Sequence, residues 1–199
     1  MIVLAGRNLA KMETAKAELD ELGVESYLCK TDIADRAQVQ ALADYAASLG
    51  DVTQVIHTSG VSPSDTATEN IIRINAAGTV NMVEAFYPVL AEGGVMINFP
   101  PSRPTPCRRR TNGRRCLKHG MSRISMTGCY LTPMHQKLID NQPETAENQL
   151  ELIPAGRWGY PYEMGALTAF LCSSGAGYIN GVDILADGGQ NAGIFVPQI

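Results

Sequence analysis

The sequence predicts a doubly wound α/β fold, in which a parallel β-sheet carries helices on both faces. Short apolar runs alternate with helical patterns, and each strand–helix pair takes about 30 residues, which is typical of this class. The chain has 199 residues, of which 45% are hydrophobic and 18% charged, as in ordinary globular proteins. No internal repeat or linker divides it, so we expect a single domain over residues 1–199.

The first half of the chain supplies most of this alternation. Strands are expected at four apolar runs, residues 1–5, 25–29, 53–57 and 94–99, and helices between them at residues 9–22, 36–49 and 68–90. Asn8 and Asp35 precede the first two helices and are suited to cap them. The apolar side chains of the first helix share one face, which predicts that they are buried: Leu9, Met12, Ala15, Leu19 and Leu22.

A basic block then interrupts the pattern. Seven of the 16 Lys and Arg residues fall between Arg103 and Lys118, and no acidic residue occurs between Glu92 and Asp140. Residues 100–120 have almost no apolar side chains to bury, so we expect an irregular basic loop. Order should resume near residue 124, with helices at 132–141 and 161–173 and a last strand at 182–186. In the second of these helices we expect four side chains to point inward: Met164, Leu167, Phe170 and Leu171.

Composition narrows the functional classes. The net charge of −4 argues against a nucleic-acid-binding protein as a whole. Five irregularly spaced cysteines favour a reducing compartment, and no signal peptide or 18-residue apolar stretch is found, so we expect a cytoplasmic protein without membrane contact. The spacing of the cysteines and His119 does not match a structural zinc site, and no metal site is predicted.

Several motifs occur in a specific order. The segment IPAGRWGYPYEMGALTAFLCSSGAGYINGVDILADGG (153–189) places a P-x-G-R-x-G turn before a P-x-E helix and ends in D-G-G. Asn75 lies in RINAAGTVNMVEAF, which is similar to a V-N-x-x-G pattern. The segments TDIAD, IHTSGV and CYLTPM are similar to D-V-T-D, N-N-A-G and P-G-x-x-x-T-x-M motifs. On these residues the chain resembles the short-chain dehydrogenases/reductases, which implies a Rossmann-type fold that binds NAD or NADP and transfers a hydride to or from an alcohol or carbonyl substrate.

The resemblance also implies a set of site residues. Asn75 matches a catalytic asparagine of the family. Arg7 follows the first strand and resembles the arginine that selects the 2′-phosphate, so NADP is favoured over NAD. The other positions that match cofactor-binding motifs are Asp32, Ile33, Thr58, Ser59, Gly60, Thr132 and Met134.

Three family features have no counterpart in the sequence. The opening strand with its T-G-x-x-x-G-I-G turn is absent, and Met1 stands where the second strand should begin, which would expose two central strand edges. Pro101 stands where the active serine is expected, and Ser102 is one position late. No Y-x-x-x-K motif occurs, so the general acid/base and its lysine are lost. We therefore expect impaired catalysis.

The basic block admits more than one interpretation. Its composition and the short distance to the next motif are typical of a coding region read in the wrong frame with a deletion. A non-catalytic nucleotide-binding or regulatory fragment is one alternative function, and a nucleic-acid-binding protein that uses the block is another. Family members act on small molecules and form homo-oligomers, but the helix that usually forms their interface has no counterpart here.

Overall fold

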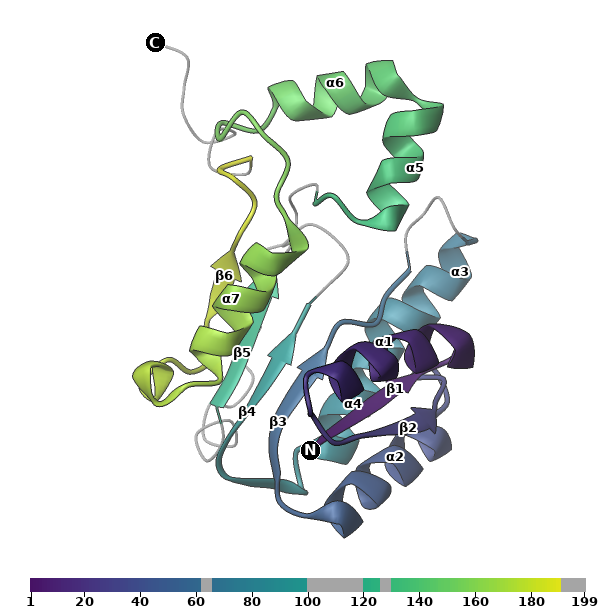
Figure 1. The fold of residues 1–199 in the computed structure, drawn as a ribbon, viewed down its shortest axis with the longest axis vertical. Coiled ribbons are helices and arrows are strands. Elements are labelled where there is room, and N and C mark those ends of the chain that lie inside the picture. The colour runs from purple at the N-terminus through teal and green to yellow at the C-terminus, as the bar shows by residue number, and fades with distance from the viewer. Residues whose placement is uncertain (62–65, 100–119, 126–129, 191–199) are drawn as a thin grey trace. The chain divides into compact units, whose positions relative to one another are not determined.

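The structure, a computed structural model, describes residues 1–61, 66–99, 120–125 and 130–190 (Figure 1). The chain forms two compact units, Met1–Gly94 and Val95–Ile199, and strand β4 (Leu90–Asn98) crosses the boundary between them. The predicted basic loop at 100–120 lies outside the described residues, except for Gly120.

The first unit opens with two parallel strands joined by a helix. Strand β1 (Ile2–Gly6) pairs with β2 (Ser26–Lys30), with Ile2 opposite Ser26. Helix α1 (Leu9–Glu21) connects them and packs on both strands (Figure 1). Parallel strands joined by a helix form a βαβ unit, so the alternation predicted at the start of the chain is confirmed.

Both predicted N-caps are present. The Asn8 side chain accepts the backbone N–H of Lys11 at 3.1 Å. The Asp35 carboxylate accepts the N–H groups of Ala37 and Gln38 at 2.9 and 3.2 Å at the start of α2 (Arg36–Leu49). These hydrogen bonds, that of Gln38 above all, lower the pKa of Asp35. The bounds of α2 are those predicted, and its residues Val39 and Leu42 are buried.

The remaining elements of the first unit differ from the single long helix predicted at 68–90. Strand β3 (Val52–His57) is followed by α3 (Thr68–Ile71), the π-helical segment η1 (Ile72–Gly78) and α4 (Thr79–Phe86). The helical region ends four residues early because Pro88 cannot continue it, and Leu90 already belongs to β4.

The strands of the first unit fall into two sheets. Among the described residues, β1 pairs with β2 and β3 pairs with β4, and the two pairs belong to different sheets. Contacts of the helical region connect them. Asn81 Nδ2 on α4 donates to the carbonyl of Ile33 after β2 at 2.9 Å, and Arg36 on α2 pairs with Glu84 on α4 at 2.8 Å. A Cβ at Gly78 would lie 2.7 Å from the Ile33 side chain, so this close approach requires glycine.

The second unit contains a parallel arrangement of its own. The end of β4 pairs with β5 (Gly120–Ser125), which pairs with β6 (Asp183–Leu185). The core of this unit lies between the end of β4, α7 (Pro161–Leu171) and η2 (Ser174–Ala176). Four buried residues form it: Ile97, Phe99, Leu171 and Ala176. Order resumes at Gly120, before the predicted position near 124, because β5 pairs with β4 from Gly120 onward; this strand itself was not predicted.

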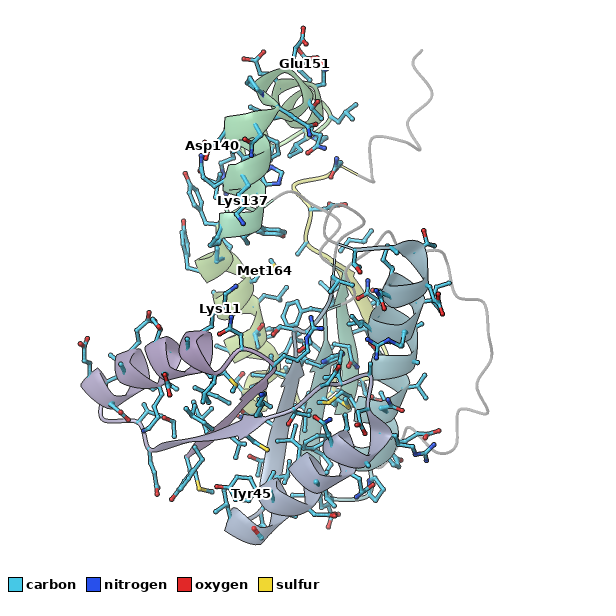
Figure 2. The ribbon with its side chains drawn as sticks, turned by 90° about the vertical axis from the view of Figure 1, so that its right-hand side faces the viewer. Lys11, Tyr45, Lys137, Asp140, Glu151 and Met164 are labelled. Carbon is cyan, nitrogen blue, oxygen red and sulfur yellow. The ribbon has the colours of Figure 1, made fainter. Side chains whose placement is uncertain are left out.

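Two further helices, α5 (Pro133–Asn141) and α6 (Pro143–Glu151), pack against each other. Figure 2 shows Lys137 and Asp140 projecting from α5 and Glu151 at the end of α6. Helix α5 confirms the prediction, whereas α6 was not predicted. Its sequence PETAENQLE is almost entirely polar and only Ala146 is buried, so no apolar periodicity indicates it. The one available signal is Pro143 at its first position.

Three side chains that were predicted to be buried are exposed. Leu9 is 46% exposed and Leu22 76%, because they stand at the first residue and the C-cap of α1 rather than in its middle. Phe170 on α7 is 47% exposed, and Thr168 is buried on that helix instead. In the part of the chain that the structure describes, none of the helices has the length and apolar character needed to cross a membrane.

Candidate functional site

Three predicted binding segments of the first unit follow its strands directly. Arg7 comes directly after β1, and Thr58–Gly60 come directly after β3. Asp32 and Ile33 come after β2, from which one residue, Thr31, separates them. Open parallel α/β sheets bind their ligands outside the carboxyl ends of the strands. The fold therefore places each of these segments at the kind of position where this class of sheet binds a ligand.

Arg7 and Asp32 lie at the same end of the β1–β2 pair. The backbone N–H of Thr31 donates to the carbonyl of Gly6 at 3.0 Å, so the residues just before Asp32 and Arg7 are joined by a hydrogen bond. The Arg7 side chain is exposed, and no ion pair of Arg7 is found within the described part of the chain. The guanidinium is thus accessible to an anionic group.

The turn at Asp32 is held by hydrogen bonds of its own. Asp32 Oδ1 accepts the N–H of Ala34 at 3.0 Å, and the N–H of Asp32 donates to Gln38 Oε1 at 2.9 Å. Ile33, the next residue, is 9% exposed and packs against Gly78. Ile33 therefore anchors the turn from inside, while Asp32 remains half-buried at its surface.

Asn75 lies in the π-helical segment η1 and holds the residue that follows the β3 turn. Its Oδ1 accepts the backbone N–H of Val61, and its Nδ2 donates to the Val61 carbonyl, both at 2.9 Å. This pair of hydrogen bonds between one side-chain amide and the backbone of one residue fixes the far end of the segment Thr58–Gly60. Thr58 and Gly60 themselves are exposed and Ser59 is half-buried.

In the second unit, Thr132 and Met134 stand at the start of α5. Thr132 Oγ1 accepts the N–H of His135 at 3.3 Å, and the Thr132 carbonyl accepts the N–H of Gln136 at 2.9 Å, so Thr132 acts as the N-cap of this helix. Met134 is the second residue of α5. Ser102, the displaced serine, lies outside the described residues.

Tyr130 is a tightly packed residue that the sequence did not indicate. It is 7% exposed, and its hydroxyl donates to the Ala186 carbonyl. Burial, together with the charges of Asp187 and Glu163, raises the pKa of Tyr130 to about 12. Its ring packs on Gly159, where an added Cβ would overlap the ring. No sequence spacing links the two residues, because their contact is long-range.

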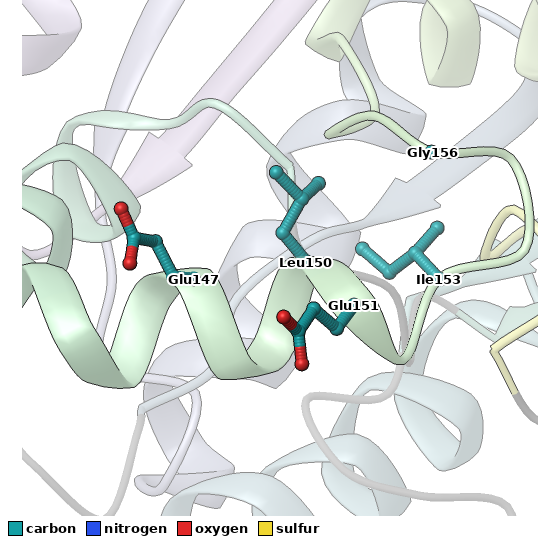
Figure 3. A pocket seen from close by; sticks show the side chains of 5 residues that line it. All are labelled: Glu147, Leu150, Glu151, Ile153 and Gly156. Atoms are coloured by element: carbon teal, nitrogen blue, oxygen red, sulfur yellow. The ribbon is translucent and has the colours of Figure 1, made fainter.

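Two cavities of the second unit lie apart from the predicted residues. One, of about 420 Å³, is lined by Tyr130, Arg157, Glu163 and Asp187 among others. The other, of about 380 Å³, is formed by Glu147, Leu150 and Glu151 of α6 with Ile153 and Gly156 (Figure 3). Neither contains a predicted site residue. Within the described ranges, no three His, Cys, Asp or Glu side chains gather in a way that could hold a metal ion.

The parallel α/β strands, with polar and basic residues at their carboxyl ends, define the class of nucleotide-binding Rossmann-like folds. Comparison with known families narrows this class. Residues 1–99 match the model of the short chain dehydrogenase family, and residues 124–191 match the model described as enoyl-(acyl carrier protein) reductase. The chain belongs to the short-chain dehydrogenase/reductase family, an NAD(P)-dependent oxidoreductase lineage. Residues 100–123, which include the basic block, lie in neither match.

Individual relatives agree with this assignment. D-threitol dehydrogenase of Mycolicibacterium smegmatis is 30% identical over 185 residues, an alignment that covers 79% of this chain and 70% of that protein. Levodione reductase of Leifsonia aquatica is 23% identical over 216 residues, and this alignment covers 91% of this chain and 81% of that protein. Among solved structures, a gluconate 5-dehydrogenase from Burkholderia cenocepacia in complex with NADP and tartrate has a similar fold, with a TM-score of 0.75 at 23% identity; the match covers 96% of this chain and 85% of that one.

Proposed function

We propose that this protein binds the adenosine end of NADP and turns over little or no substrate. The observation that carries the proposal is the accessible guanidinium of Arg7 at the carboxyl end of β1, beside the Asp32 turn at the end of β2. The loss of turnover rests on a second fact, the absence of a Y-x-x-x-K motif from the sequence.

The residues fit one end of the cofactor better than the other. Arg7 presents a planar guanidinium that can form two parallel hydrogen bonds with a phosphate, which favours NADP over NAD. Asp32 and Ile33 would line the adenine, and Thr58–Gly60 would continue the site at the end of β3. Residues 1–199 contain no T-G-x-x-x-G-x-G turn to approach the pyrophosphate, so we expect a polypeptide of these residues alone to bind weakly. Thr132 and Met134 are assigned to the nicotinamide by family resemblance alone.

A bound nicotinamide would supply hydride chemistry, but the sequence contains no Y-x-x-x-K motif to handle the proton. The Tyr130 phenol has a pKa of about 12 and donates its hydrogen to Ala186. A general acid/base works best when its pKa lies near the operating pH, and such a group contributes about 10²–10⁴-fold. Asn75 has both side-chain amide atoms engaged with Val61, so it positions backbone rather than transferring protons.

We propose that residues 100–123 come from a shifted reading frame. These residues lie in neither family match, and the basic block within them has almost no apolar side chains. The nucleotide sequence of the gene tests this statement.

An alternative within the same site is a regulatory protein that senses NADP without using it as a redox cofactor. The same accessible Arg7 favours it. A complete absence of turnover would fit this alternative, whereas slow residual turnover would fit an impaired oxidoreductase. The purified protein should be assayed with NADPH and NADH against a panel of aldehydes, ketones and polyols that includes threitol. We expect no substrate-dependent change in nicotinamide absorbance. Robust turnover that Asn75→Ala abolishes would overturn the proposed loss of catalysis.

A further inference from the structure

The helical region around Asn75 departs from regular α-helical hydrogen bonding at Thr79. In a regular α-helix, the carbonyl of Asn75 would accept the backbone N–H of Thr79. Here the N–H of Thr79 donates to the carbonyl of Ala76 instead. The Asn75 carbonyl accepts the hydroxyl of Thr79, with an oxygen–oxygen distance of 2.8 Å. A side-chain hydroxyl therefore replaces the amide at the point where the π-helical segment η1 meets α4.

A buried histidine contacts the same hydroxyl. His57, the last residue of β3, is 3% exposed, and its Nε2 lies 3.2 Å from Thr79 Oγ1. A threonine hydroxyl has one hydrogen to donate, and the shorter bond, to the Asn75 carbonyl, uses it. The hydroxyl oxygen must then be the acceptor for His57, which requires a hydrogen on Nε2. Burial lowers the pKa of His57, so the ring is neutral at neutral pH and Nδ1 carries no hydrogen.

We infer that His57 and Thr79 are positioning residues that hold Asn75 in place and, through it, the turn after β3. The hydrogen bonds run from His57 to Thr79, from Thr79 to the Asn75 carbonyl, and from the Asn75 amide to both backbone groups of Val61. The chain from His57 to Val61 closes this ring. The enclosed segment, Thr58–Gly60, is the one assigned to cofactor binding, so the role in binding rests on the proposed function.

The ring explains why β3 ends on a histidine that has no access to solvent. A histidine that only filled space would need no particular tautomer and would not affect the hydrogen bonds of Val61, which are made with Asn75. A positioning residue has both properties. Loss of one bond in the ring should be felt at Val61, while hydrogen bonds elsewhere in the first unit should not change.

The first measurement needs no substitution. Long-range ¹H–¹⁵N spectra of the intact protein distinguish the two neutral histidine tautomers. We expect His57 to carry its hydrogen on Nε2 at neutral pH. A hydrogen on Nδ1 alone would overturn the inference, because Nε2 would then have to accept from Thr79, whose only hydrogen could not also go to the Asn75 carbonyl. A charged ring also carries a hydrogen on Nε2 and would agree with the bond to Thr79.

The second measurement uses matched variants. Thr79→Val keeps the shape of the side chain and removes the hydroxyl, whereas Thr79→Ser retains it. A net hydrogen bond is worth about a fivefold change in an equilibrium. We therefore expect amide exchange of Val61 to be about fivefold faster in Thr79→Val and within about twofold of wild type in Thr79→Ser. The amide of Gln38, which bonds to Asp35, is the internal reference and should not change. Equal Val61 exchange in both variants would contradict the positioning role.

Titration of the same variants with NADP separates this inference from the proposed function. If wild type binds NADP, Thr79→Val should weaken binding about three- to fivefold and Thr79→Ser should not, in line with the loss of one net hydrogen bond. If wild type does not bind NADP, the proposed function fails, whereas the tautomer and the exchange of Val61 still decide the positioning role.

Discussion

The polar residues of the two units are used in different ways. At the strand ends of the first unit, the Arg7 side chain and the segment Thr58–Gly60 are accessible. The supporting hydrogen bonds come from two asparagines of the helical region, Asn75 to Val61 and Asn81 to Ile33. In the second unit, Tyr130 is buried on a backbone carbonyl, and Arg157 and Glu163 form a two-pronged pair at the start of α7. The difference is what we expect if the first unit holds the proposed binding positions, while these polar groups of the second unit stabilise structure.

The largest expected effect tests the structural role of Tyr130. Gly159→Ala would place a methyl group inside the volume of the Tyr130 ring, and overpacking of this kind typically costs about 1–3 kcal/mol. We expect a lower urea midpoint for this variant. Gly165→Ala on α7 is the matched control, because no atom lies within 4 Å of its added Cβ and alanine favours a helix. If Gly159→Ala is as stable as Gly165→Ala, the packing of Tyr130 does not stabilise the second unit.

A smaller effect is expected from the cap of α2 in the first unit. Asp35→Ala removes the acceptor of two backbone N–H groups and should reduce the free energy of unfolding by about 1 kcal/mol. Asp35→Asn keeps a capping oxygen and should lose less. Equilibrium unfolding in urea compares the three proteins. An unchanged stability in Asp35→Ala would show that the helix start does not limit the stability of this unit.

The smallest effect concerns acid stability. The bonds from Arg157 and from the N–H of Tyr160 lower the pKa of Glu163 to about 2. In an unfolded chain the pKa of a glutamate is about 4.3. Because the folded pKa is the lower one, this stabilisation is present above about pH 4.3 and is lost as the pH falls toward 2.

As the pH is lowered from 5 to 2, the midpoint temperature of thermal unfolding should therefore fall more steeply in wild type than in Glu163→Gln. The Arg157 side chain is 53% exposed and that of Glu163 is 31% exposed, so water screens the pair and the difference should be small. Arg157→Gln removes the partner and should flatten the profile in the same direction. Identical slopes in wild type and both variants would mean that the pair makes no contribution to stability.

Local signals in the sequence predicted the first unit well. Asn8 and Asp35 are capping residues next to apolar periodic segments, and both cap helices in the structure. The hydrogen bonds that His57 and Thr79 form next to Asn75 were not predicted, because these residues lie on different elements. The contact between Tyr130 and Gly159 was missed for the same reason. Helix α6 was missed because a polar helix on the surface has no apolar periodicity.

The candidate site shows the same division. Motif resemblance selected Arg7, Asp32 and Asn75, and the structure places each at a strand end or against the turn that follows one. The sequence did not reveal that both amide atoms of Asn75 are engaged with Val61 or that the tyrosine after the basic block is buried. Such facts depend on three-dimensional neighbours that no spacing in the sequence records.

The most direct test of the central claim is a calorimetric titration of the protein with NADP and with NAD. We expect NADP to bind about tenfold more tightly, since one charge-assisted contact with the 2′-phosphate is worth roughly 1.5 kcal/mol. Arg7→Ala should abolish this preference, and Lys11→Ala, which removes an exposed positive charge from α1 (Figure 2), should preserve it. Equal affinities for the two dinucleotides, or a preference that survives Arg7→Ala, would contradict the claim that Arg7 forms a binding position in the first unit.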